Sequence, residues 1–128
     1  MEISVQAREN SVTGGNGKEV ASYAPGTVLV LSCNPEDQWS LLTGNRDFST
    51  NANGLPTRHH ARGNQAFRTG TLVGSFDNGA TFFSVGTVLT TIVTATNRDG
   101  NAATLKLYCW DSDNHNNSGA ISVYVQAQ

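Results

Sequence analysis

The sequence predicts an all-β protein, an antiparallel β-sandwich of jelly-roll type with a single domain over residues 1–128. Short runs alternate apolar and polar residues, and turn sequences rich in Gly, Asn and Pro separate them. No window combines apolar residues at helical spacing with capping residues. A chain of 128 residues suits one domain with a sizeable core.

Seven runs predict strands. The run over 121–126 places Ile121, Val123 and Val125 on one face, and the run over 27–33 is continuously apolar, as in a strand buried on both faces. Turn signals follow at Pro25-Gly26, Asp77-Asn78-Gly79, Asp99-Gly100-Asn101 and Ser118-Gly119. The predicted strands are residues 3–7, 27–33, 71–76, 80–83, 90–95, 104–110 and 121–126.

Residues 43–65 interrupt this pattern, because the stretch is polar and too long for an ordinary connection. Segments of this length in compact domains are usually functional or disordered. Cys33 and Cys109 both lie in apolar runs, which fits either two buried thiols or a disulfide.

Composition excludes several partners. The net charge is −2 and the eight Lys and Arg residues are scattered, so nucleic-acid binding is not expected. The group Arg58, Arg62 and Arg68 is interpreted as part of a solvated loop. No segment approaches the ~20 apolar residues of a membrane span. The first residues carry no classical signal peptide, so we expect a cytoplasmic protein or one secreted by a non-classical route.

No catalytic motif is present, and we expect no enzyme activity. The sequence has no nucleophile elbow, phosphate-binding loop or dinucleotide fingerprint, and its three His residues lack metalloprotease spacing. Asp111 and Asp113 lie on one polar turn rather than on opposing sides of a cleft, as paired glycosidase carboxyls would.

The turn before the last predicted strand is the strongest functional signal. The stretch "DSDNHNNS", residues 111–118, supplies the carboxylate and amide oxygens that Ca²⁺ prefers. It is not an EF-hand, because position six is Asn116 instead of Gly and position twelve is Ser122 instead of Glu. From these residues alone, a calcium loop and a simple polar turn both remain open.

The stretch "DSDNHNNSGAISVYV" resembles the carboxy-terminal signature of the PA-IL-like family of bacterial galactophilic lectins. "YAPGTVLVLS", "TGTLVGSF" and "FFSVGT" resemble other strands of that family, whereas residues 34–65 match poorly. The resemblance implies a galactose-binding-domain-like sandwich and a calcium-dependent lectin for galactose-containing glycans that assembles as a homo-oligomer, a dimer or tetramer.

The resemblance also implies a site. Bound Ca²⁺ would bridge protein and sugar, and its ligands would be Leu42 through its carbonyl, Asp111, Asp113, Asn116 and Asn117. The sugar contacts would be Asp111, Ser112, Asp113 and Asn116 on the turn, with His59, His60 and Trp39 from the preceding segments.

Alternatives remain for both the individual residues and the function. The two adjacent His residues also fit a solvated loop, and Trp39 also fits core packing. The alternative function is a non-catalytic interaction module with a structural calcium and no sugar binding. A glycan-active enzyme is a further rival.

Overall fold

The computed structural model describes residues 1–94 and 102–128, and within these ranges it is built of antiparallel strands with one short 3₁₀ turn. This confirms the predicted all-β sandwich. The elements are β1 (Glu2–Gln6), β2 (Lys18–Tyr23), β3 (Val28–Ser32), β4 (Trp39–Ser40), η1 (Arg46–Phe48), β5 (Ser49–Thr50), β6 (Arg58–Arg62), β7 (Gln65–Arg68), β8 (Leu72–Ser75), β9 (Phe83–Ser84), β10 (Val88–Ile92), β11 (Ala103–Cys109) and β12 (Ser118–Ala127).

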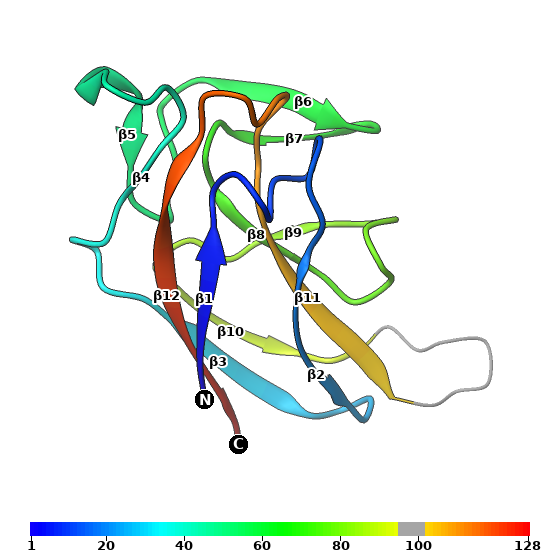
Figure 1. The fold of residues 1–128 in the computed structure, drawn as a ribbon. Helices are drawn as coiled ribbons and strands as arrows, with labels where there is room; N and C mark the ends of the chain where they lie inside the picture. The colour runs from blue at the N-terminus through cyan, green and yellow to red at the C-terminus, as the bar shows by residue number, and fades with distance from the viewer. Residues whose placement is uncertain (95–101) are drawn as a thin grey trace.

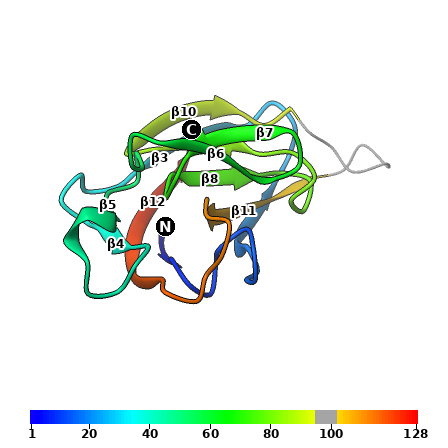
Figure 2. The same ribbon diagram turned by 90° about the horizontal axis from the view of Figure 1, so that it is seen from above.

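Two sheets face each other, and a hairpin lies beside them (Figures 1 and 2). The first sheet has the order β10-β3-β12-β4-β5, and β1 pairs with the free side of β12. The second has the order β2-β11-β8-β9, and β6 pairs with β7 to form the hairpin. The chain crosses between the sheets from β1 to β2, β2 to β3, β9 to β10, β10 to β11 and β11 to β12.

Alternating side chains from both sheets form the main core. In β12, Ile121 and Val123 are fully buried, while Tyr124 between the apolar positions is exposed. Leu105 and Leu107 of β11 meet this face from the opposite sheet and are also fully buried. Such alternation is typical of an antiparallel sheet with one face in the core.

The second sheet is covered on its outer face as well. Trp110 lies edge-on against Phe67 of β7 and Phe82, at ring-centroid distances of 4.8 and 5.3 Å. Together with Val73 and Tyr108, these aromatic rings form a second core cluster. The strand that is buried on both faces is therefore β8, in which all four residues are buried.

Several expectations about individual segments need correction. The outer positions of β3 are only half buried, so this strand is not buried on both faces. Residues 43–65 contain η1, β5 and β6, and β7 begins at Gln65; Ala52 and Leu55 pack in the main core and Ala61 against the second cluster. Residues 80–82 lie between β8 and β9 outside any strand, and the predicted strand there is reduced to β9.

Some predicted features lie at or beyond the limits of the described residues, and five strands, β2 and β4 to β7, were missed. The turn at Asp99-Gly100-Asn101 and the last predicted residue of the strand over 90–95 lie outside the described residues. Strand β2 was not predicted at all, because its half-buried pattern carries little apolar alternation.

Cys33 and Cys109 are both buried free thiols. Burial raises the pKa of Cys33 to about 11 and raises that of Cys109 well above its usual range. No helix in residues 1–94 or 102–128 is long and apolar enough to cross a membrane.

Candidate metal site at the tip of the last hairpin

The connection from β11 to β12 places two polar side chains inside the protein and the rest at its surface. Asp111 is 7% exposed and Asn117 is 3% exposed, although neither lies within a strand. Ser112, Asp113 and Asn116 are exposed between them. The connection, termed the tip (residues 111–117), thus has a buried polar base and an exposed polar rim.

The carboxylate of Asp111 takes its hydrogen bonds from its own turn. The backbone N–H of Ser112 donates to its Oδ1 at 2.8 Å, and the Asn117 side chain and the Asp113 backbone N–H also lie against it. Burial is the main cause of a raised pKa at Asp111 and the charge of Asp113 adds to the rise, whereas the hydrogen bonds from Asn117, Ser112 and Asp113 oppose it. A cation would remove the desolvation penalty of this carboxylate.

Asn117 presents an oxygen without a donor. Its Nδ2 donates to the backbone oxygen of Ala7 at 2.9 Å, which fixes the orientation of the amide because a carbonyl can only accept. Its Oδ1 is then buried with no hydrogen-bond partner among the described residues. A buried acceptor left unsatisfied costs about 1–3 kcal/mol.

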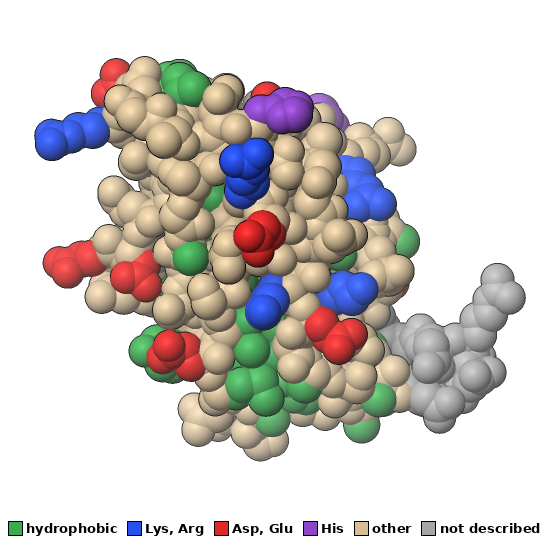
Figure 3. Space-filling model, in the orientation of Figure 1, with side chains coloured by type: hydrophobic (Ala, Val, Ile, Leu, Met, Phe, Trp, Pro, Cys, Tyr) green, Lys and Arg blue, Asp and Glu red, His purple; other side chains and the backbone are tan. Residues whose placement is uncertain are grey.

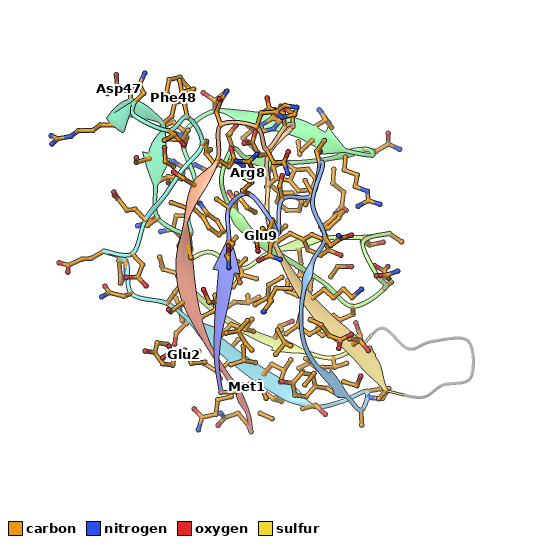
Figure 4. All side chains as sticks on the ribbon, in the orientation of Figure 1. Met1, Glu2, Arg8, Glu9, Asp47 and Phe48 are labelled. Carbon is orange, nitrogen blue, oxygen red and sulfur yellow. The ribbon has the colours of Figure 1, made fainter. Side chains whose placement is uncertain are left out.

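Two other segments hold the tip in place. Asn114 Nδ2 donates to the backbone oxygen of Arg8 at 3.0 Å, and Figure 4 shows Arg8 just below the tip. The backbone N–H and Oγ1 of Thr43 both donate to the carbonyl oxygen of Asn116, at 2.8 and 2.9 Å. The side chain of Asn116 remains exposed and free to bind a ligand.

The Leu42 carbonyl is directed away from the tip. The peptide between Leu42 and Thr43 is trans, so this carbonyl points opposite to the Thr43 N–H that donates to Asn116. It accepts from the backbone N–H of Asn45 at 3.0 Å. At the rim, Asp113 accepts from the backbone N–H of His115 at 3.3 Å and keeps the rest of its carboxylate in solvent. Of the five predicted calcium ligands, four thus lie in the tip itself, and the Leu42 carbonyl does not face it.

Two predicted sugar contacts are placed elsewhere. Trp39 is 1% exposed, and its Nε1 donates to the backbone oxygen of Gly70 at 2.9 Å, so its ring belongs to the core. His59 is tied to Thr69 Oγ1 through Nδ1 at 2.6 Å, and its Nε2 is buried. Neither side chain offers a group to a sugar at the surface. His60 is exposed on β6.

One surface residue near the tip was missed by sequence reasoning. Phe48 ends η1, is 42% exposed, and accepts a hydrogen bond at its carbonyl oxygen from Leu41 N–H at 2.9 Å. Figure 4 shows Phe48 at the same end of the molecule as the tip. The sequence signal that could have identified Phe48 is an aromatic residue within a polar stretch.

The described residues contain no group of three or more His, Cys, Asp and Glu side chains placed to hold a metal ion. The tip is a different kind of arrangement, with two carboxylates accompanied by amide and backbone oxygens, which are the ligands that Ca²⁺ takes in proteins. Figure 3 shows acidic and basic side chains scattered over the visible face, with His side chains gathered at the end that carries the tip.

No protein-family model matches the sequence, and no curated protein matches it.

Proposed function

We propose that this protein is a calcium-dependent carbohydrate-binding protein whose site is the tip. The observation that supports the proposal most strongly is the pairing of a buried Asp111 carboxylate with the unsatisfied buried Oδ1 of Asn117. A hard cation would offset the charge of Asp111 and satisfy the Asn117 oxygen, whereas a purely structural turn would be expected to supply a donor to that oxygen.

The five proposed ligands divide into buried and accessible oxygens. Asp111 and Asn117 would hold Ca²⁺ from the protein side, and the Leu42 carbonyl would join them only after its peptide turned toward the tip. Asn116 and Asp113 would complete the protein ligands from the exposed rim. Because Ca²⁺ takes six to eight oxygens, this set leaves coordination positions for water or a ligand hydroxyl pair.

A sugar with two adjacent hydroxyls is the proposed ligand. The hydroxyls would replace two waters on the ion, while the exposed side chains of Ser112, Asp113 and Asn116 offer further hydrogen bonds. Phe48 offers an apolar surface near the tip for the less polar face of a sugar ring. Galactose-containing glycans are the proposed class, following the resemblance of residues 111–125.

The burial of Trp39 and of the His59 ring nitrogen favours one rival. This rival is a structural-calcium module: in the absence of sugar contacts from Trp39 and His59, calcium would stabilise the tip and no sugar would bind. The rival predicts that calcium raises the melting temperature and that galactose adds nothing. A glycan-active enzyme, by contrast, would release the aglycone of an aryl galactoside.

The deciding experiment is retention on galactose-agarose in millimolar calcium, with elution by EDTA, together with calorimetric titration of galactose into calcium-loaded protein. Retention that requires calcium and is reversed by EDTA supports the proposal. Calcium-dependent stabilisation without galactose binding would establish the structural-calcium rival, and no calcium response at all would refute both. Sedimentation of the same sample tests the proposed homo-oligomer, in which several weak sites would act together.

A further inference from the structure

A second surface site lies away from the tip, between the β6–β7 turn and the β8–β9 connection. These two segments border a pocket of about 530 Å³ lined by residues 62–65 and 79–82. Figure 1 shows both segments reaching the right-hand side of the molecule, while the segment with β4 and β5 lies on the left. The pocket therefore shares no residue with the candidate calcium site.

The walls of the pocket are fixed to each other by side-chain hydrogen bonds. Gln65 Nε2 donates to the backbone oxygen of Phe82 at 2.7 Å, and Phe82 N–H donates back to Gln65 Oε1 at 2.7 Å. On the other side of the turn, Thr81 N–H donates to Asp77 Oδ1 at 2.8 Å. The pocket is thus held open by the fold, as expected of a preformed ligand site.

Two hydrogen-bond donors converge over Gly79 at the edge of this pocket. A Cβ built on Gly79 would lie 3.2 Å from Tyr108 Oη and 3.3 Å from Arg62 Nη1. Gly79 has a φ of +86°, which favours glycine and leaves this space open. Neither donor group makes a hydrogen bond to another described residue. Arg62 is exposed and lines the pocket, whereas Tyr108 is 4% exposed and offers only its hydroxyl beside Gly79.

The charge around this space is positive. Arg62 is the one charged residue among those lining the pocket. Lys106 lies close by, and its Nζ donates to Asn78 Oδ1 at 2.6 Å. Asp77 is the nearby acid, and its Oδ1 already accepts from Ser75 Oγ and Thr81 N–H. A guanidinium and a phenol hydroxyl together are suited to an oxyanion, because both donate and the guanidinium carries charge.

We propose that Arg62 and Tyr108 bind the oxyanion group of a small ligand, a carboxylate or a phosphate, in the pocket beside Gly79. The site is independent of calcium and of the tip. Neutral sugars lack the charge that Arg62 recognises and are not ligands of this pocket.

The test is an amide NMR titration of calcium-free protein with three probes: inorganic phosphate, galacturonate and galactose. We expect the amide signals of residues 79–82 to move with phosphate, galacturonate or both, and not with galactose. A response to phosphate alone identifies a phosphate-bearing ligand, and a response to galacturonate alone identifies a carboxylate. If neither anion moves these signals, the proposal is wrong.

Variants connect the response to the named donors. Arg62→Gln should weaken anion binding at least about tenfold, because it removes both a hydrogen bond and the positive charge. Tyr108→Phe should weaken it about fivefold, because it removes one hydrogen bond. Arg58→Gln is the matched control, because Arg58 lies on the same strand and donates to the Ala66 carbonyl at 3.0 Å. Undiminished binding by Arg62→Gln would overturn the proposal, even if Tyr108→Phe failed to fold.

Discussion

Replacing Asp111 by Asn tests whether Asp111 is a calcium ligand or an ordinary turn residue. The new side chain has nearly the same shape, but it carries no charge and adds an amide donor. Its oxygen can still accept from Ser112 N–H, as Asp111 Oδ1 does at 2.8 Å, whereas its nitrogen cannot accept the hydrogen bond from the Asn117 side chain. We nevertheless expect Asp111→Asn to stabilise the calcium-free protein at neutral pH, because the raised pKa of Asp111 means that burial of its charge costs more than its hydrogen bonds return.

The expected magnitude is that of one buried polar group whose desolvation is not fully compensated. Removing that penalty recovers about 1–2 kcal/mol. An unfolding entropy of about 2.1 cal/mol/K per residue gives about 0.27 kcal/mol/K for this chain of 128 residues, so the melting temperature should rise by about 4–7 °C. In the wild type, calcium at about 100 times its dissociation constant should add about 2.7 kcal/mol, or about 10 °C. Asp111→Asn should lose that calcium increment.

Calorimetry with and without calcium measures both effects. Asp113→Asn is the matched control for the calcium-free state, because it makes the same change of charge on an exposed residue of the same turn. Its calcium-free melting temperature should stay within about 2 °C of the wild type. A lower calcium-free melting temperature for Asp111→Asn, or a calcium response equal to that of the wild type, would refute the assignment.

Three further predictions address pH and the sugar site. Because burial raises the pKa of Asp111 in the folded state, calcium-free stability should increase as the pH falls through that pKa. The calcium-induced rise in melting temperature should shrink over the same range, and calorimetry from neutral pH to about pH 4 should show neither change in Asp111→Asn. Phe48→Ala should weaken galactose binding about tenfold by titration calorimetry with an unchanged calcium response, whereas Tyr124→Ala, at another exposed aromatic residue, should bind like the wild type. Trp39→Phe should lower unfolding free energy by about 1–2 kcal/mol in denaturant titration, through loss of the bond to Gly70, and change galactose affinity less than twofold.

Short-range patterns in the sequence predicted the parts of the fold that depend on neighbouring residues. The alternation in β12 correctly assigned Ile121, Val123 and Val125 to the core, because residues two apart share one face of a strand. The prediction that the strand over 27–33 is buried on both faces was wrong, because a continuous apolar sequence does not reveal whether a second layer covers the outer face. That layer covers β8 instead, and it comes from a hairpin that has few apolar residues of its own.

The candidate site was likewise predictable only where it depends on local sequence. The density of oxygen-bearing side chains after residue 110 was evident from composition, but the burial of only Asp111 and Asn117 depends on partners distant in the chain. Asn117 donates to the carbonyl of Ala7, 110 residues away, and no local pattern encodes that contact. For the same reason, the burial of Trp39 against Gly70 could not be distinguished from an exposed position beside a sugar.

The way the tip is anchored determines how a bound cation would act on the whole protein. Asn117 is tied to the end of β1 through Ala7, and Asn116 is tied through Thr43 to the segment that follows β4. An ion held by the tip would thus be coupled, through these hydrogen bonds, to two segments that are far from the tip in sequence. Its binding energy would oppose global unfolding instead of local loosening of one turn, because neither segment can separate without disturbing a ligand residue. The calcium effect should therefore appear in the cooperative melting transition, which is the transition that the Asp111→Asn comparison measures.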